Sequence, residues 1–281
     1  MELIARLVVE GFIAGLHRSP FHGFSVEFSE YRAYNPGDSV GRIDWKVYAK
    51  TDRHYVKLFE EETNLRGTLL LDGSRSMDFA GDAGRVTKFR YASMLAAGLA
   101  YLLIRQQDAV GLITFDERIR QVLPARSVRR HLYDLLTTID QQRPGGLTDV
   151  GATLHRAAEL VKRRGLVILI SDLLDEPERV LAGLKHFRHR GHEVLVFHVL
   201  DPLERDLDLR REVRLEDLET GETLRTQPWF IRREAGERVA AWVQQLESEC
   251  REHRIDYVSL TTDTPFDVAL RRVLDRRARQ R

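Results

Sequence analysis

After Asn64 the sequence alternates short apolar runs with longer stretches of helical periodicity. Residues 69–71 and 166–170 are continuous apolar runs, a pattern typical of strands that are buried on both faces of a sheet. Residues 85–105 instead repeat their apolar side chains at the spacing of one helix face. Strands that alternate with helices of this length form a parallel sheet covered on both faces, because the crossovers are right-handed. The sequence therefore predicts a doubly wound α/β domain over residues 66–281.

One predicted strand runs against the others. Residues 109–115 and 118–123 are strand-like and are joined at Asp116-Glu117, a connection too short for a parallel crossover, so the second is an antiparallel edge strand. An inserted hairpin is expected within residues 201–233, where the alternation stops. The other predicted strands are residues 68–71, 166–170, 193–199 and 256–260, and the other helices are residues 128–139, 153–164, 178–190, 234–253 and 265–277.

Residues 1–65 are expected to form a separate segment ahead of this domain. Glu2, Arg6 and Glu10 recur every four residues, which indicates the polar face of a helix over residues 2–16. Residues 20–62 are rich in aromatic and turn-forming residues, which predicts short strands, one at 56–59, and a tight turn at 35–38. A β-rich segment of this size does not hold together alone, so we expect it to pack on the α/β domain.

Charge and cysteine content exclude several classes of protein. The chain carries 44 Lys and Arg against 43 Asp and Glu, so overall attraction to nucleic acid or to an anionic membrane is not implied. Cys250 is the only cysteine, which excludes an internal disulfide and a cysteine metal cluster and fits a reducing compartment. No stretch approaches the roughly 18 uninterrupted apolar residues of a membrane-spanning helix. We therefore expect a cytoplasmic protein without an integral membrane segment.

Three loops at predicted strand ends carry side-chain oxygens. The first apolar run leads into Asp72-Gly73-Ser74-Arg75-Ser76, and the second ends at Asp172. Between them, the glycine-rich loop at residues 144–149 presents Thr148. Open parallel sheets bind ligands at the carboxyl ends of their strands, where the winding reverses. An all-oxygen set suits Mg²⁺, or Mn²⁺ or Ca²⁺, and is poor for zinc or copper. The predicted metal ligands are Asp72, Ser74, Ser76, Thr148 and Asp172.

The same residues also have a plainer interpretation. Ser74 and Ser76 belong to the residue types that cap a following helix or satisfy turn amides. Thr148 and Asp149 equally suit the N-cap of the next helix, and we expect Asp149 to be one. Asp172 gains weight as a ligand only through its combination with the first loop.

The set resembles the metal-ion-dependent adhesion site of von Willebrand factor A domains, whose motif is matched by Asp72-x-Ser74-x-Ser76, then Thr148, then Asp172. The resemblance implies that Ser74 and Ser76 coordinate the ion directly and that Thr148 does so directly or through water. It also implies that the two aspartates act mainly through bound waters. An ion held by neutral hydroxyls stays electrophilic and keeps an open position. A carboxylate of a partner protein is its expected occupant.

The N-terminal segment carries a second motif. Tyr31-Arg32-Ala33-Tyr34-Asn35-Pro36-Gly37-Asp38, followed by Arg42-Ile43-Asp44-Trp45, is similar to the signature of the bacterial family called domain of unknown function fifty-eight. Members of that family join such a segment to a von Willebrand A-like domain. The resemblance implies a partnership with a MoxR-type AAA+ ATPase, in which the protein acts as adaptor or co-chaperone on a client protein. Many relatives carry two membrane helices ahead of this segment, but we do not expect membrane anchoring here.

Four residues near these motifs are candidate partner contacts. Arg75 lies between the two predicted serine ligands and Met77 follows them, Asp149 follows Thr148, and Trp45 belongs to the aromatic segment. Packing of the aromatic rings, with ion pairs that pin the turn, is the alternative interpretation of that segment. A partner surface would leave Trp45 exposed.

A metal-dependent hydrolase or phosphatase is the main alternative to a non-enzymatic interaction protein. It would use Asp72 and Asp172, but a dehalogenase-like enzyme needs a second acid at the position of Ser74. His155 lies roughly 10 Å along its helix from the glycine-rich loop, at about 1.5 Å per residue. His198 is then the remaining candidate base, although a buried, hydrogen-bonded core histidine is the more common case.

A nucleic-acid-binding module is the second alternative. It would use Arg126, Arg129, Arg130 and His131, or the arginine-rich C-terminus. These residues lack the aromatic interleaving of a base-stacking surface. A solvated helix face is therefore the favoured interpretation, and no nucleic-acid partner is expected.

Overall fold

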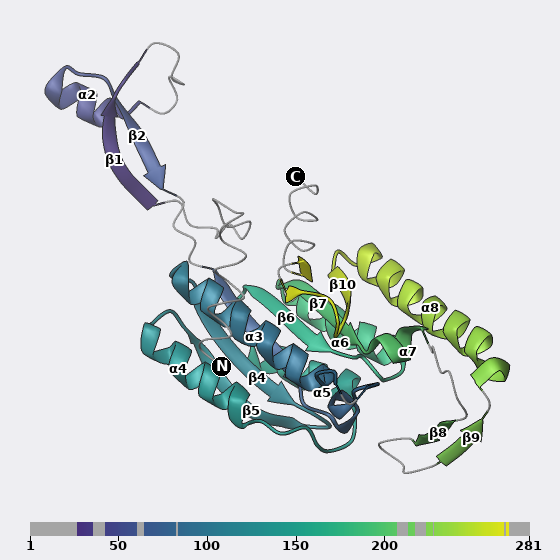
Figure 1. Ribbon diagram of the computed structural model, residues 1–281. Helices are drawn as coiled ribbons and strands as arrows, with labels where there is room; N and C mark the ends of the chain where they lie inside the picture. The colour runs from purple at the N-terminus through teal and green to yellow at the C-terminus, as the bar shows by residue number, and fades with distance from the viewer. Residues whose placement is uncertain are drawn as a thin grey trace. The chain divides into compact units, whose positions relative to one another are not determined.

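The computed structural model contains two compact units, and within the described residues the boundary between them lies between Leu65 and Arg66 (Figure 1). The predicted helix over residues 2–16, the centre of the turn at 35–38 and most of the predicted C-terminal helix lie outside the described residues. The expected packing of the N-terminal segment on the α/β domain stays a prediction. The described residues are 27–35, 43–60, 65–82, 84–206, 213–216, 223–226, 228–266 and 268–269.

The larger unit is built on a six-stranded sheet in the order β10-β7-β6-β3-β4-β5 (Figure 1). All pairs are parallel except the one at the edge, where β5 runs antiparallel to β4. Every residue of β6 is buried, as expected for a strand covered on both faces. The predicted α/β class, with a mostly parallel sheet and one antiparallel edge strand, is confirmed. The strands are β3 (Arg66–Asp72), β4 (Ala109–Phe115), β5 (Ile119–Arg126), β6 (Leu166–Ser171), β7 (Glu193–Leu200) and β10 (Asp256–Thr261).

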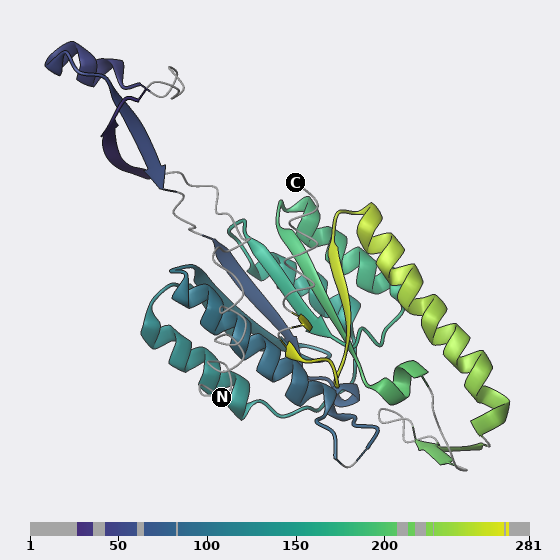
Figure 2. The ribbon, with the colours of Figure 1, turned by 45° about the horizontal axis from the view of Figure 1, so that its top comes forward.

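Helices cover both faces of this sheet (Figure 2). The helices are α3 (Lys88–Arg105), α4 (Arg129–Gln141), α5 (Val150–Leu160), α6 (Pro177–His189) and α8 (Pro228–Glu252). The α3 and α4 helices pack together on one face. On the other face, Leu154 of α5, Leu184 of α6 and Leu246 of α8 share one apolar core with the sheet. No helix in the described part of the chain is both long and apolar enough to span a membrane.

Helix capping explains where the observed bounds differ from the predicted ones. The α3 helix begins at Lys88, because the Thr87 side chain accepts a backbone N–H of its first turn. The α5 helix begins at Val150 rather than at residue 153, because the Asp149 carboxylate accepts the N–H of Ala152. The α8 helix begins at Pro228 rather than at residue 234, and proline is favoured at the first helical position.

A short helix and a hairpin separate β7 from α8. The α7 helix (Pro202–Asp206) follows β7 directly, and β8 (Val213–Glu216) pairs antiparallel with β9 (Thr223–Thr226). The predicted inserted hairpin is therefore present. The sequence interpretation did not include α7.

The smaller unit contains one antiparallel strand pair and one helix. The β1 strand (Glu27–Ala33) pairs with β2 (Tyr55–Glu60), and α2 (Trp45–Thr51) lies between them in sequence. The interpretation of this segment as strands and turns alone was therefore wrong at α2. Asp44 explains the helix, because its carboxylate accepts two backbone N–H groups of the first turn.

Candidate metal centre

The predicted ligands lie at the carboxyl ends of two neighbouring central strands. The β3 and β6 strands pair in parallel with Leu71 opposite Ile170, so Asp72 and Ser171 follow side by side at the end of the pair. The chain leaves β3 through α3 on one face of the sheet and reaches β6 through α5 on the other. The winding of the sheet therefore reverses between these two strands, which is where open α/β sheets bind ligands.

The loop after β3 folds around the Asp72 carboxylate. One carboxylate oxygen accepts the N–H of Ser74 at 2.9 Å, and the other accepts the hydroxyl of Ser171. The Ser74 Oγ lies 3.0 Å from the Ser76 Oγ, and both side chains are buried. Ser74 precedes the 3₁₀ helix Arg75–Asp78, but its side chain makes no capping hydrogen bond there. The two hydroxyls therefore face each other rather than a helix end.

The glycine-rich loop brings a third hydroxyl to the same place. The Thr148 Oγ1 lies 3.5 Å from the Ser76 Oγ. A backbone hydrogen bond of 3.2 Å from the Arg75 N–H to the Gly146 carbonyl joins the two loops. Gly146 has a φ of 82°, a conformation that glycine adopts without steric cost. The structure thus brings together the three hydroxyl residues that the sequence selected.

Asp149 holds the glycine-rich loop in place. It is the N-cap of α5, and its carboxylate lies 2.6 Å from the Arg179 guanidinium of α6. Arg179 also lies 3.2 Å from Asp175, which follows β6. One arginine therefore connects the two loops that carry Thr148 and Asp172.

Asp172 contributes a second buried carboxylate from the loop after β6. Its Oδ2 lies 2.8 Å from the Lys88 Nζ, and its Oδ1 accepts the N–H of Leu174 at 3.2 Å. The next residue, Leu173, has a φ of 54°, which costs a residue with a side chain roughly 1–3 kcal/mol. A hydrogen bond of 2.9 Å from the Leu173 N–H to the Ser171 Oγ supports this turn. Backbone strain of this kind is concentrated at binding sites.

The sequence interpretation missed three residues of this site. Ser171 and Lys88 contact the two predicted aspartates, and Glu204 of α7 places its Oε1 2.6 Å from the Lys88 Nζ. Lys88 left a signal in the sequence, because it lies four residues before Ala92 on the apolar stripe of α3. A lysine on such a stripe indicates a buried partner of opposite charge.

The two aspartates place negative charge in a buried site. Burial raises the pKa of Asp72 to about 7, the charge of Asp172 adds to the rise, and hydrogen bonds from Ser171 and Ser74 oppose it. Three hydroxyls and two carboxylates are donors that suit a hard divalent cation. A cation would also offset the repulsion between the carboxylates. The residues present therefore fit the predicted ion.

Removal of divalent ions is expected to make stability depend on the protonation of Asp72. The ordinary pKa of an aspartate is 3.8, whereas the folded value is about 7, so between these values the folded state holds a proton that the unfolded chain has lost. The stability that protonated Asp72 contributes is fully present below its ordinary pKa and is lost as pH rises through about 7. In EDTA, the unfolding free energy should fall between about pH 5 and about pH 8, by roughly 1.4 kcal/mol or more. Urea denaturation at a series of pH values measures this fall in the unfolding free energy.

Asp72→Asn is the matched control for this pH dependence, because it keeps the shape of the side chain and removes the titration. The wild-type protein should lose stability relative to this variant as pH rises. A stability difference that stays constant across the range would contradict the raised pKa of Asp72.

A comparison with known proteins decides the family. The model of the family described as protein of unknown function DUF58 matches residues 30–243, which is more than half of the chain. The chain belongs to this family. The DUF58 chain is 31% identical over 224 residues to the uncharacterized protein Rv1480 of Mycobacterium tuberculosis, an alignment that covers 79% of this chain and 69% of the relative. The uncharacterized protein Mb1516 of Mycobacterium bovis gives the same values. The family predicted from the sequence motifs is thus confirmed.

Solved structures similar to the DUF58 chain agree with its fold. BatB from Bacteroides thetaiotaomicron aligns with a TM-score of 0.51 and 18% identity, over 76% of this chain and 99% of BatB. An aerotolerance-related membrane protein from Bacteroides fragilis gives the same values. The VWA domain of Rpn10 aligns at 13% identity over 74% of this chain and 94% of that domain, with a TM-score of only 0.38. The BatB alignment thus confirms the predicted von Willebrand A-like fold.

The predicted partner contacts of the DUF58 chain differ in exposure. Arg75 is exposed and lies between Ser74 and Ser76 in the loop after β3. Met77 has no exposed surface, so its predicted contact is not available in this conformation and its role is packing. Trp45 is 54% exposed and rests edge-on against the Tyr48 and His54 rings. Arg75 and Trp45 therefore stay candidates, whereas Asp149 is already paired with Arg179.

The residues weighed for catalysis in the DUF58 chain have structural partners. His198 is buried, hydrogen-bonds to the Tyr257 hydroxyl and meets the Trp242 ring edge-on. Burial lowers the pKa of His198 to about 4, so the ring is neutral near pH 7. The His155 Nδ1 lies 3.1 Å from the His186 Nδ1 on α6. The buried His198 therefore fits a role in packing better than the role of a general base beside Asp72, and the exposed His155 contacts α6 instead.

The residues weighed for nucleic-acid binding are divided between surface and core. Arg126, Arg129 and Arg130 are exposed, as a solvated face requires. His131 is buried, and its Nε2 lies 2.9 Å from the Val110 carbonyl. His131 therefore fixes α4 to the sheet rather than joining the arginines in one basic surface.

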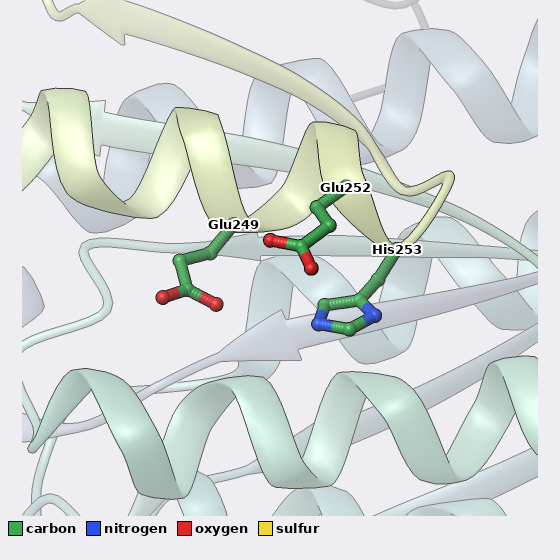
Figure 3. A group of neighbouring side chains, drawn as sticks. All are labelled: Glu249, Glu252 and His253. Atoms are coloured by element: carbon green, nitrogen blue, oxygen red, sulfur yellow. The ribbon is translucent and has the colours of Figure 1, made fainter.

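A second group of possible metal-binding side chains lies near the end of α8. Glu249 and Glu252 lie in the last turn of α8, His253 follows that turn, and the ligand atoms of the three side chains lie within 4.8 Å of one another (Figure 3). Glu252 is exposed and the other two are half-buried. Groups of acidic side chains are common on helix surfaces, so their proximity does not make this group a metal site.

Proposed function

We propose that this DUF58 chain is a non-enzymatic, metal-dependent protein-interaction module. The observation that carries the proposal is the convergence of three hydroxyl side chains beside two fully buried aspartates, Asp72 and Asp172. Ser74 and Ser76 would hold Mg²⁺, or Mn²⁺ or Ca²⁺, directly, and Thr148 would do so directly or through water. The ion would supply a positive, open coordination position for a carboxylate of a partner.

Hydrogen bonding supports a role for both aspartates through bound waters. Each carboxylate already receives two protein donors: the Ser74 N–H and the Ser171 hydroxyl on Asp72, and the Leu174 N–H and Lys88 on Asp172. Donors of this kind share the negative charge that a direct bond to the ion would otherwise receive. An ion with less charge donated to it attracts an incoming carboxylate more strongly.

The proposed partners are a MoxR-type AAA+ ATPase and a client protein. The family resemblance supports this part of the proposal, together with a fold that is typical of interaction modules. In this arrangement the chain acts as an adaptor or co-chaperone between the ATPase and its client. The exposed residues Arg75 and Trp45 are the candidate contacts outside the metal centre.

Co-purification with a MoxR-type ATPase of the same host tests the proposal. The purified chain, immobilised on resin, should retain the ATPase in Mg²⁺. In EDTA its affinity for the ATPase should fall roughly tenfold or more, which is a loss of about 1.4 kcal/mol or more in binding free energy. Asp72→Ala should reproduce the EDTA result in the presence of Mg²⁺. Ser127→Ala, an exposed change between β5 and α4, is the control and should bind as the wild type does. Equal retention with Mg²⁺, with EDTA and by Asp72→Ala would reject the metal centre as the recognition device.

A further inference from the structure

Lys88 is a fully buried cation at the candidate metal centre. It is the first residue of α3, and its Nζ lies 2.8 Å from the Asp172 Oδ2 and 2.6 Å from the Glu204 Oε1. The Phe79 ring lies on a further side, with its centroid 5.8 Å from the Nζ. Burial lowers the pKa of Lys88, but the carboxylates of Asp172 and Glu204 outweigh burial and raise it above its ordinary value. The ammonium is therefore charged at neutral pH.

The position of Lys88 matters because of the charges around it. Asp72 and Asp172 are both fully buried, so their attraction for a cation is weakly screened. Lys88 offsets part of that attraction from within the protein, at hydrogen-bond distance from Asp172. A divalent ion that enters the centre then meets less negative charge than two free carboxylates would offer.

Glu204 is a second carboxylate that pairs with Lys88, in addition to Asp172. Its second oxygen, Oε2, accepts the Asp201 N–H at 2.9 Å, which fixes Glu204 at the start of α7. The negative charge of Glu204 partly cancels the electrostatic effect of the Lys88 charge at the metal centre. Removal of the Glu204 charge would therefore leave the centre less negative.

We propose that Lys88 is an internal cation that lowers the divalent-ion affinity of the metal centre and holds Asp172 back from direct coordination, with Glu204 moderating its effect. This inference rests on the proposed metal centre. Lys88 acts on the ion through Asp172 and is thus a positioning residue. A role in folding alone predicts instead that loss of Lys88 weakens ion binding, because damage to a site lowers its affinity for its ligand.

Ion affinity in charge variants tests the inference. Mg²⁺ binding is measured by calorimetry and by the rise in melting temperature, with the full chain at fixed ionic strength. Lys88→Met should bind Mg²⁺ roughly tenfold more tightly than the wild type, or more, since one opposing charge is removed at close range. Lys88→Arg keeps the charge and should stay near the wild-type affinity. Glu204→Gln should bind Mg²⁺ more weakly, because Lys88 then faces Asp172 alone.

The outcomes separate this inference from the metal centre itself. If wild type binds Mg²⁺ and a folded Lys88→Met binds it equally or less tightly, the role of Lys88 is overturned and the metal centre stands. If Lys88→Met does not fold, Glu204→Gln decides: weaker binding supports the inference, and unchanged or tighter binding overturns it. If neither the wild type nor any variant binds Mg²⁺, Mn²⁺ or Ca²⁺, the metal centre fails and the inference fails with it.

Discussion

In the double variant Ser74→Ala/Ser76→Ala, the rise in melting temperature caused by Mg²⁺ is expected to disappear. An ion that binds only the folded protein stabilises it by about 2.7 kcal/mol at a concentration of 100 times its dissociation constant. In a domain of this size each kcal/mol is worth about 2–4 °C, so the wild-type rise should be several degrees. Both hydroxyls are buried and face each other 3.0 Å apart, so their removal takes away the two proposed direct ligands together. Differential scanning calorimetry with and without EDTA measures the rise.

Two controls keep this result specific. Ser127→Ala makes the same chemical change at an exposed position and should keep the full Mg²⁺ effect. The double variant in EDTA should melt close to the wild type in EDTA, because Ser74 does not cap the following 3₁₀ helix. If the double variant still gains stability from Mg²⁺ as the wild type does, these serines do not hold the ion.

The sheet and the position of the centre could be predicted because local patterns determine them. The β6 strand is apolar at every position from Leu166 to Ile170. This pattern is typical of a strand that is covered on both faces of its sheet. The point where such a run meets Asp72 or Asp172 marks the carboxyl end of the strand. Parallel pairing then brings the two ends together, since all these strands point the same way.

Elements without a pattern of their own were predicted poorly. The α2 helix has no buried face that repeats at helical spacing, and its existence depends on capping by Asp44. The observed starts of α3 and α5 differ from the predicted ones for a similar reason, because capping by Thr87 and Asp149 decides where these helices begin. A capping residue is a single position, so it carries less information than a periodic pattern.

Long-range contacts made the remaining residues of the centre hard to predict. Glu204 reaches Lys88 from a segment 116 positions along the chain, and Asp172 reaches it from 84 positions away. Neither separation is set by a local rule. Only the presence of a lysine on an apolar helix face pointed to such a contact, and it did not identify the partner.

Loss of Lys88 is expected to have the largest effect on the stability of the metal-free protein. Lys88→Met fills most of the same volume but leaves the carboxylates of Asp172 and Glu204 without their shared cation. Breaking a buried ion pair on one side costs roughly 3–5 kcal/mol, because the remaining charge stays buried and unpaired. Urea denaturation in EDTA at neutral pH should show this loss as a lower midpoint with little change in slope.

The triple variant Lys88→Met/Asp172→Asn/Glu204→Gln separates charge from shape. It removes all three charges and keeps side chains of nearly the same size, and a neutral replacement of a whole buried ion cluster is often close to neutral in stability. Most of the loss seen in Lys88→Met should therefore be recovered, which is a coupling that independent sites would not show. A triple variant as unstable as Lys88→Met would mean that the lysine side chain is needed for packing and not for its charge. Recovery would instead show that the fold tolerates a neutral centre, so that the charges of Asp172, Lys88 and Glu204 are not required for the stability of the sheet.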